Sequence, residues 1–449
     1  MMLPDSWIAA VHFARTRWCL DFRDRARLEA WQQVRLQRFI REVLPRAPYY
    51  RRRPAKALAD IPLMDKATMM AEFEDRNTCG IRLDKALDIG LEAERTRDFR
   101  PLLGDFTVGL SSGTSGNRGV FLVSRGERLH WAGVLLARAL PQHLLGRLFL
   151  PWVPALRVAF FMRANSNLYA TLSSRRIDFT FHDLMLGVEP AVPKLNRSQP
   201  DVLVGPPSLL RALAAEIRAG RLDIAPSHVL SVADVLEDSD RAAIHAAFHV
   251  PTHQLYQATE GFLGYTCERG TLHLNESCVH IEPDWLDAGR SRFHPIVTDF
   301  SRDTQLIVRY RLNDVLRLAT EPCACGRAEL AIEAIEGRAD EVLYLPARGT
   351  GQAVLIYPDL IRRTMLLAGP EVREFDLVQD GMFLTLGLLT EGERSAAVSR
   401  VAAEFDALWR TLGVCPPTMI FTDWHMPPPG GKRRRVRRKS APEGLTCMP

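Results

Sequence analysis

The chain has 449 residues, of which 47% are hydrophobic and 25% are charged, and its 58 Lys and Arg against 53 Asp and Glu give a formal charge of +5. This composition excludes a disordered or collagen-like chain, and the length predicts roughly two to four structural units with a large core. Eight cysteines, most of them scattered singly, are not a secreted disulfide framework, so we expect a cytoplasmic protein. The N-terminus has no apolar run of signal-peptide type, and arginines and prolines interrupt the most apolar stretch, 144–162, so no transmembrane segment is expected.

The positive charge is concentrated near the C-terminus, where seven Lys and Arg residues lie between 432 and 439. Because these seven exceed the total of +5, the rest of the chain carries a net charge of −2. A protein that binds nucleic acid or an anionic surface would have to use this segment alone, and no nucleic-acid-binding motif accompanies it. Such binding is therefore kept only as a remote alternative.

The spacing of apolar residues changes along the chain. Residues 26–43 have helical spacing, and we expect a helical segment over 1–100. From about residue 105 short apolar runs alternate with helical patterns, which predicts layered α/β sheets, and closer runs after 256 predict a β-rich region. A compact mixture of strands and helices follows residue 337. We therefore predict a large N-terminal domain (1–337), a hinge (338–341), a small mobile α+β C-terminal domain (342–430) and a basic tail (431–449).

A Ser/Gly-rich loop precedes the predicted strand at 120–123. Residues 110–119 read Leu-Ser-Ser-Gly-Thr-Ser-Gly-Asn-Arg-Gly. Glycines let the backbone form a concave nest of N–H groups for phosphate oxygens, although no Walker A lysine follows. The alternative is a flexible turn. The candidate phosphate-binding residues are Ser111, Ser112, Gly113, Thr114, Ser115, Gly116 and Arg118.

Further motifs follow this loop in order. They are Tyr256-Gln257-Ala258-Thr259-Glu260-Gly261, Tyr310-Arg311-Leu312-Asn313-Asp314, Ile335-Glu336-Gly337-Arg338-Ala339-Asp340 and Gly430-Gly431-Lys432. With these motifs the chain resembles the adenylate-forming (ANL) superfamily, most closely its phenylacetate-CoA ligase and coenzyme F390 synthetase branch. The segments 48–51 and 61–66 also resemble that branch, so the resemblance covers nearly the whole chain. It implies the adenylate-forming enzyme fold.

The resemblance implies an acid–thiol ligase. ATP and a carboxylic acid would form an acyl- or aryl-adenylate with release of pyrophosphate, and coenzyme A would then capture the acyl group. An alternative acceptor is a hydroxyl that keeps the AMP, as in the F390 synthetase relatives. The pocket for the acid is guessed around Phe160, Phe161, Asn165, Tyr169 and 206–208. It mixes aromatic residues with few charges, which favours an aromatic or medium-chain acid. A homodimer is left open.

The resemblance also implies individual roles. The catalytic residues would be Lys432, which reaches the carboxylate and α-phosphate, Glu260, which ligates Mg²⁺, and Thr259, which contacts the α-phosphate. Asp314 would hold the ribose hydroxyls with help from Arg338. Asp340 would be the hinge. The nucleotide pocket would also contain Tyr256 against adenine, Gln257, Ala233 and Asp234. Arg118, Asn117 and Asn313 depart from the usual family residues, which puts the acceptor in more doubt than ATP binding.

Four residues suggest a metal site. Cys323 and Cys325 lie in a predicted turn, and Cys267 and His273 lie upstream in a predicted hairpin. Three thiolates and one imidazole make a tetrahedral structural zinc site, and some relatives in the resembled branch carry a Cys/His set in this place. The alternative is free core cysteines with a surface histidine, and His280 could replace His273.

Overall fold

The structure is a computed structural model that describes residues 4–99, 103–111, 119–162, 166–338, 341–426 and 434–442. The chain divides into two compact units, the first made of 1–312 and 317–334 and the second of 313–316 and 335–449. Each unit is described by itself. The predicted hinge at 338–341 stays a prediction, since residues 339 and 340 lie outside the described ranges.

The first unit begins with helices that cap and pack as their sequences dictate. The Asp24 side chain accepts a hydrogen bond from the Arg27 N–H at the start of α2, and Asp65 does the same for Thr68 at the start of α4. The helices of this segment are α1 (Asp5–Ala14), α2 (Arg25–Arg38), α3 (Pro48–Arg52), α4 (Lys66–Ala71), α5 (Phe73–Arg76) and α6 (Leu83–Thr96).

A two-stranded antiparallel sheet follows, made of β1 (Thr107–Leu110) and β2 (Val120–Val123). Leu110 pairs with Val120, so residues 111–119 connect the paired ends of the two strands. Ser124 then caps α7 (Arg125–Ala139), and Glu127 completes a capping box with it. The two described ends of the Ser/Gly-rich segment thus continue from a hairpin whose strands are buried.

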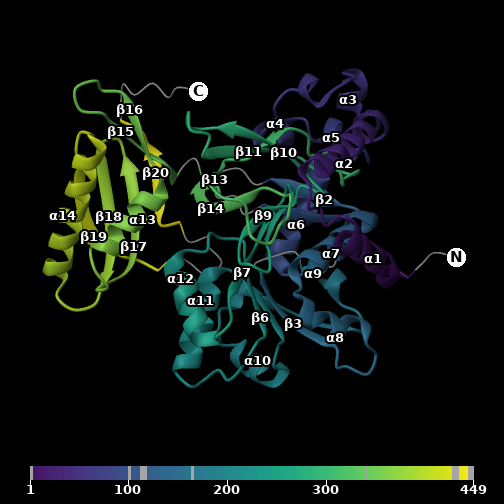
Figure 1. The fold of residues 1–449 in the computed structure, drawn as a ribbon, viewed down its shortest axis with the longest axis horizontal. Coiled ribbons are helices and arrows are strands. Elements are labelled where there is room, and N and C mark those ends of the chain that lie inside the picture. The colour runs from purple at the N-terminus through teal and green to yellow at the C-terminus, as the bar shows by residue number, and fades with distance from the viewer. Residues whose placement is uncertain are drawn as a thin grey trace. The chain divides into compact units, whose positions relative to one another are not determined.

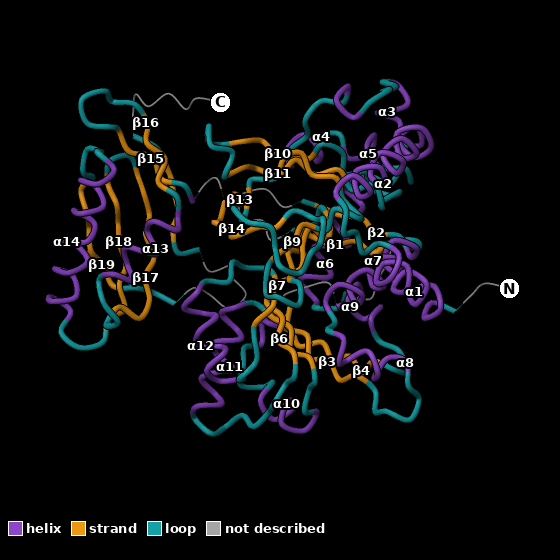
Figure 2. Tube along the Cα trace, viewed as in Figure 1, coloured by secondary structure: helices purple, strands orange, loops and turns teal. Residues whose placement is uncertain are grey.

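A large mixed sheet forms the centre of the first unit (Figures 1 and 2). Its strand order is β10-β11-β13-β14-β9-β8-β7-β6-β5-β3-β4, and β12 pairs with β11. The strands β4, β3, β5, β6 and β7 run parallel, whereas β7, β8 and β9 are antiparallel. The bounds are β3 (Leu156–Met162), β4 (Ile177–Asp183), β5 (Val202–Gly205), β6 (His228–Val232), β7 (Thr252–Ala258), β8 (Gly261–Thr266), β9 (Leu272–Leu274), β10 (His280–Trp285), β11 (Arg292–Thr298), β12 (Tyr310–Arg311), β13 (Asp314–Leu318) and β14 (Ala331–Arg338).

Helices cover both faces of the parallel part. Phe160 of β3 belongs to the core that contains the apolar face of α7, and Phe161 belongs to the core under α11 and α12. Successive side chains of a strand point to opposite faces, so both cores are built from alternate residues of the same strands. The remaining helices of this unit are α8 (Leu145–Phe149), α9 (Ser166–Tyr169), α10 (Val192–Ser198), α11 (Pro207–Arg218) and α12 (Asp238–Phe248).

The second unit is an α+β fold around a four-stranded sheet of order β19-β18-β17-β20. Its core contains Phe405 and Trp409 of α14, which lie one helical turn apart and are fully buried. The elements are β15 (Leu343–Pro346), β16 (Ala353–Ile356), α13 (Pro358–Leu367), β17 (Val372–Asp380), β18 (Phe383–Thr390), α14 (Arg394–Leu412), β19 (Thr418–Asp423) and β20 (Val436–Ser440).

Part of the basic segment is folded. Residues 436–440 form β20, parallel to β17, and the Val436 side chain is in the core. Arg434 pairs with Glu341 at 3.0 Å, Arg435 with Glu374 at 3.1 Å, and Arg437 with Asp376 at 3.7 Å. The expectation of a separate tail over 431–449 is therefore wrong for 436–440, because this stretch pairs with β17 as a strand and buries Val436.

No helix within the described ranges is both long enough and apolar enough to cross a membrane.

Candidate active site and metal centre

Several predicted site residues lie where parallel strands end. Ala233 and Asp234 follow β6, and Thr259 and Glu260 follow the neighbouring strand β7. The carboxyl ends of neighbouring parallel strands meet at one edge of a sheet, which is where open α/β sheets bind ligands. Ala233 has a φ of +75°, an uncommon conformation for a residue with a side chain, and such backbone strain clusters at functional sites.

Thr259 and Glu260 form the turn between β7 and β8. Ala258 pairs with Gly261, which leaves these two residues at the tip, both half-buried. The Thr259 hydroxyl donates a hydrogen bond to Oε2 of Glu260 at 2.8 Å. Behind the turn, a Cβ on Gly261 would lie 3.1 Å from a carboxylate oxygen of Asp299, so the start of β8 passes close to that residue. Burial raises the pKa of Asp299.

Tyr256 and Gln257 precede this turn on β7. Tyr256 is buried and lies against Gly264 of β8, where a Cβ would approach the Tyr256 Cβ to 3.4 Å. Gln257 points toward α7, since its Oε1 accepts a hydrogen bond from Nε1 of Trp131 at 3.0 Å. Trp131 was not among the predicted site residues, because its position on a helix with apolar spacing is typical of core packing.

Trp131 belongs to an aromatic cluster on the α7 side of the sheet. Its ring lies 5.6 Å from that of Tyr169, which lies 4.4 Å from that of Phe160. Burial raises the pKa of the Tyr169 phenol, which is therefore neutral. The guess that Phe160 and Phe161 share one pocket is wrong: Phe161 faces the other core, where it stacks on His182. Asn165 lies outside the described residues.

The hairpin holds the base of the Ser/Gly-rich loop. The Ser111 N–H donates to the Gly119 carbonyl at 2.7 Å, and the Ser111 hydroxyl accepts from the Gly119 N–H at 2.8 Å. Ser111 thus closes the loop as a pair with Gly119. The other predicted phosphate-binding residues, together with the predicted Lys432 and Asp340, lie outside the described ranges: Ser112, Gly113, Thr114, Ser115, Gly116 and Arg118.

Asp314 and Arg338 come together on β13 and β14 of the large sheet, in the parts of these strands (314–316 and 335–338) that belong to the second unit. Asp314 begins β13 and Arg338 ends β14, and the Arg338 Nε lies 3.7 Å from Oδ1 of Asp314. The two side chains are about one-quarter exposed or less, at 25% for Arg338 and 18% for Asp314. An acceptor-only carboxylate held beside a guanidinium is a suitable arrangement for paired hydroxyl groups.

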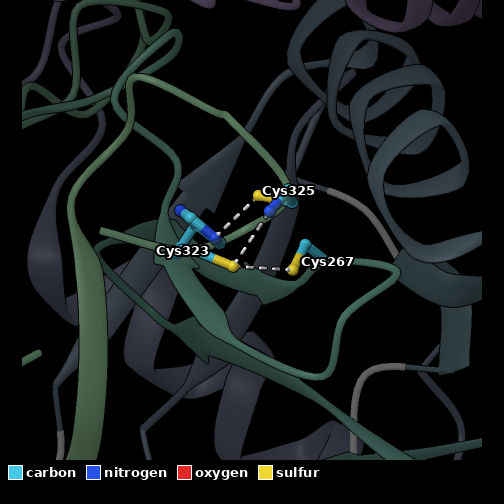
Figure 3. Close-up of side chains that lie close together, drawn as sticks. Cys267, Cys323 and Cys325 are labelled. Carbon is cyan, nitrogen blue, oxygen red and sulfur yellow. Dashed lines mark hydrogen bonds between the residues drawn. The ribbon is translucent and has the colours of Figure 1, made fainter. Parts of the chain in front are cut away.

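Cys267, His273, Cys323 and Cys325 converge on one point of the first unit. Figure 3 shows the three cysteines of this cluster close together. Their ligand atoms all lie within 4.8 Å of one another. The Sγ atoms of Cys267 and Cys323 are 3.8 Å apart, and Cys325 Sγ lies 3.4 Å from Nε2 of His273. His273, not His280, supplies the nitrogen, because His280 Nδ1 lies 3.2 Å from the Gln32 side-chain oxygen instead.

The surroundings of this cluster orient its imidazole. His273 Nδ1 donates to the Glu329 carbonyl oxygen at 2.9 Å, which leaves Nε2, the nitrogen directed at the sulfurs, as the one that could bind a metal. The Glu329 carboxylate, fully buried, is paired with Arg138 and accepts a hydrogen bond from the Tyr265 hydroxyl. An imidazole oriented in this way and three converging sulfurs fit a tetrahedral zinc ion. Glu329 was missed because nothing in the local sequence links it to a histidine on another strand.

Comparison with known proteins gives the fold. No family model matches the chain. A curated relative, protein CapK of Staphylococcus aureus, is 26% identical over 162 residues, so the match spans only 35% of this chain and 36% of that protein. A 2-hydroxyisobutyryl-CoA ligase, solved in a postadenylation state with an acyl-AMP, superposes with a TM-score of 0.65 at 17% identity over 92% of this chain and 90% of that chain.

Two further solved structures are similar. The amide bond synthetase McbA of Marinactinospora thermotolerans has a TM-score of 0.51 at 13% identity over 74% of this chain and 69% of that chain. A fatty acyl-adenylate ligase, from work on the E. coli and L. pneumophila enzymes, has a TM-score of 0.50 at 12% identity over 73% and 68%. The chain therefore has the fold of the adenylate-forming ligases.

Proposed function

We propose that this protein is an ATP-dependent ligase that activates a carboxylic acid as an acyl- or aryl-adenylate and transfers it to coenzyme A. The observation that carries this proposal is the position of the predicted nucleotide-binding residues on the adenylate-ligase fold. Ala233, Asp234, Thr259 and Glu260 lie at the carboxyl ends of neighbouring parallel strands, in the unit that also holds the closed base of the Ser/Gly-rich loop.

The reaction would have two steps. A carboxylate oxygen attacks the α-phosphorus of ATP, a new P–O bond forms, and the bond to pyrophosphate breaks. The thiolate of coenzyme A then attacks the acyl carbon, and the C–O bond to AMP breaks. Both steps concentrate negative charge around phosphate, so donors and cations fixed in advance lower the barrier.

The first unit would supply the phosphate contacts. Backbone N–H groups of 111–119 would wrap the β- and γ-phosphates, and the Thr259 hydroxyl would contact the α-phosphate. Glu260 would ligate Mg²⁺, a hard cation that prefers carboxylate oxygens and neutralises charge on the leaving pyrophosphate. In this structure the Thr259 hydroxyl donates its one proton to the Glu260 carboxylate, so it would have to turn from Glu260 to donate to the α-phosphate.

The nucleoside would be held by residues from three places. Tyr256, with Ala233 and Asp234, would line the adenine pocket. Asp314 would accept from both ribose hydroxyls while Arg338 holds its carboxylate in position. Lys432 would reach the carboxylate and α-phosphate during adenylation.

The acid would bind beside the aromatic cluster. The Trp131, Phe160 and Tyr169 rings form an apolar cluster in which Phe160 and Tyr169 are buried, and the Trp131–Gln257 hydrogen bond connects that cluster to β7, the strand before Thr259 and Glu260. This placement supports an aromatic or medium-chain acid.

We also propose that Cys267, His273, Cys323 and Cys325 hold a structural zinc ion. The ion would join β8 and β9 to the turn at 323–325, and it would stabilise the antiparallel strands behind the Thr259–Glu260 turn.

The test is pyrophosphate release from MgATP over a panel of aryl and fatty acids, with and without coenzyme A. Release that depends on the acid, with a thioester found by mass spectrometry when coenzyme A is present, is the expected result. Absence of release with every acid would contradict the proposal, and a stable AMP adduct on a hydroxyl would replace the acceptor.

A further inference from the structure

We propose that Gln305 is a positioning residue for the Ser/Gly-rich loop, because its side chain pairs with the strand that follows that loop. The inference rests on the proposed function in one respect, that the loop at 111–119 binds the phosphates of ATP. Gln305 lies in the connection between β11 and β12, far from the hairpin in sequence.

The hairpin has an edge that needs a partner. Within the described residues the sheet of β1 and β2 has only two strands, so no third strand lies beside the outer edge of β2. Val120 and Leu122 are nevertheless buried, at 2% and 0% exposure. Buried backbone N–H and C=O groups without partners are costly, so this edge must be satisfied in another way.

The Gln305 side chain satisfies it. Its Oε1 accepts a hydrogen bond from the Leu122 N–H at 2.9 Å, and its Nε2 donates to the Val120 carbonyl at 3.1 Å. The Val120 N–H is directed at Sδ of Met70, 3.4 Å away. With 1% exposure, the amide of Gln305 takes the place of one residue of a third strand.

The position of this pairing ties it to the loop. Val120 directly follows Gly119, which closes the loop with Ser111. The backbone before Gln305 is itself held, since Oε1 of Glu127 accepts from the N–H groups of Asp303 and Thr304 at 2.9 and 3.0 Å. Glu127 lies at the start of α7, so 303–305 contacts both β2 and the helix that follows it.

The consequence is a loop whose second stem is fixed before the nucleotide binds. Without the Gln305 amide, the start of β2 and the Ser111–Gly119 pair beside it would be held less firmly, and binding of ATP would have to fix them. This cost falls on nucleotide binding, whereas the aromatic cluster proposed to lie beside the acid receives none of the Gln305 side-chain hydrogen bonds found among the described residues.

The experiment is Gln305→Met, which keeps the length of the side chain and removes its two hydrogen bonds to β2, together with the one that its Nε2 donates to Sδ of Met69. With an acid that the wild type uses, the KM for MgATP should rise about tenfold and the KM for the acid should stay within about twofold. The matched control is Gln32→Met. Gln32 is also buried in the first unit, where its Nε2 donates to the Glu276 carbonyl at 2.8 Å, far in sequence from the loop.

Hydrogen exchange gives a readout that needs no turnover. In the wild type without nucleotide the Leu122 amide should be protected, and in Gln305→Met it should exchange about tenfold faster while Gln32→Met leaves it unchanged. Should Gln305→Met not fold, the wild-type exchange decides: a Leu122 amide that exchanges like an exposed strand edge overturns the pairing.

The outcomes separate the two proposals. A wild type that releases no pyrophosphate with any acid contradicts the proposed function, and exchange at Leu122 still tests the pairing. An active wild type with an unchanged KM for MgATP in folded Gln305→Met overturns the positioning role. An equal rise in Gln32→Met overturns it too, because the effect would then reflect general loss of stability.

Discussion

The Thr259 hydroxyl donates a hydrogen bond to the Glu260 carboxylate at 2.8 Å across the turn that joins β7 to β8. The turn is short and its two flanking strands are hydrogen-bonded up to Ala258 and Gly261, so both side chains are held at the carboxyl end of the parallel sheet. In the proposed reaction this turn meets the α-phosphate and the magnesium ion.

Substitution of Glu260 tests that role. Glu260→Gln keeps the shape of the side chain and the acceptor for Thr259 but removes the negative charge, so acid-dependent pyrophosphate release should fall by about 100-fold at fixed Mg²⁺. Raising the Mg²⁺ concentration should restore part of the rate. Glu92→Gln, which removes an exposed carboxylate of α6, is the control and should keep full activity. Equal activity of both variants would contradict the role of Glu260.

The Cys/His cluster predicts a metal that is measurable without turnover. Purified protein should contain about one zinc ion per chain, and Cys325→Ser should lose most of it, because a structural site needs all of its ligands. Its Tm should fall, as should that of wild-type protein treated with a strong chelator. Cys278→Ser also removes a buried thiol, but one outside the cluster, and should keep the zinc. Metal-free wild-type protein with a Tm insensitive to chelation would exclude the site.

Buried histidines predict loss of stability in acid. Burial, with smaller contributions from His12 and Arg15, lowers the pKa of His130 to about 4 from an ordinary 6.5. In the unfolded chain His130 is therefore protonated below about pH 6.5, whereas in the folded chain it is protonated only below about pH 4. The free energy of unfolding thus falls as the pH decreases from 6.5 to 4.

For His130 alone the loss from pH 7.5 to 5.5 is about 1 kcal/mol. His130→Gln, which cannot titrate, should show a smaller loss than the wild type by about that amount in urea unfolding at the two pH values. Identical pH dependence of the two proteins would show that His130 does not contribute.

Gly133 of α7 lies where α7 packs closely on α1, so a larger residue at this position should destabilise the protein. A Cβ at Gly133 would lie 2.5 Å from the Ala9 carbonyl oxygen and 2.8 Å from the Phe13 nitrogen of α1. Gly133→Ala should therefore lower the free energy of unfolding by about 1–3 kcal/mol, despite the better helix propensity of alanine. Gly126 lies in the same helix with open space around it, so Gly126→Ala should be neutral or stabilising by up to about 1 kcal/mol. Equal effects of the two changes would contradict the close packing of α1 on α7.

The spacing of residues along the chain predicted the architecture and several of the candidate site residues. Alternating strands and helices indicated the layered α/β architecture, and the glycines and hydroxyls of 111–119 indicated a loop before a strand, which the structure has at 120–123. The order of the motifs along the chain singled out Thr259 and Glu260. The Cys/His set was predicted with the correct histidine, and only its convergence needed three dimensions.

Long-range contacts escaped prediction for a physical reason. Gln305 and Leu122, or Trp131 and Gln257, are separated by more than a hundred residues, and a side chain that bonds distant backbone or amide groups leaves no periodic signal. For Phe160 and Phe161 the sequence was sufficient. Neighbouring residues of a strand face opposite sides of the sheet, so their positions in one predicted strand exclude a shared pocket. The basic segment was predicted to be a tail because its run of charged residues hid the strand at 436–440.

The central claim is that this chain joins the oxygen of a carboxylic acid to the α-phosphorus of ATP. The most direct test uses an acid from the active panel labelled with ¹⁸O in both carboxylate oxygens, with MgATP and coenzyme A, and mass spectrometry of the products. The expected products are AMP that carries one ¹⁸O atom and a thioester that keeps the other. Unlabelled AMP, or label in inorganic phosphate with ADP as the product, would contradict it.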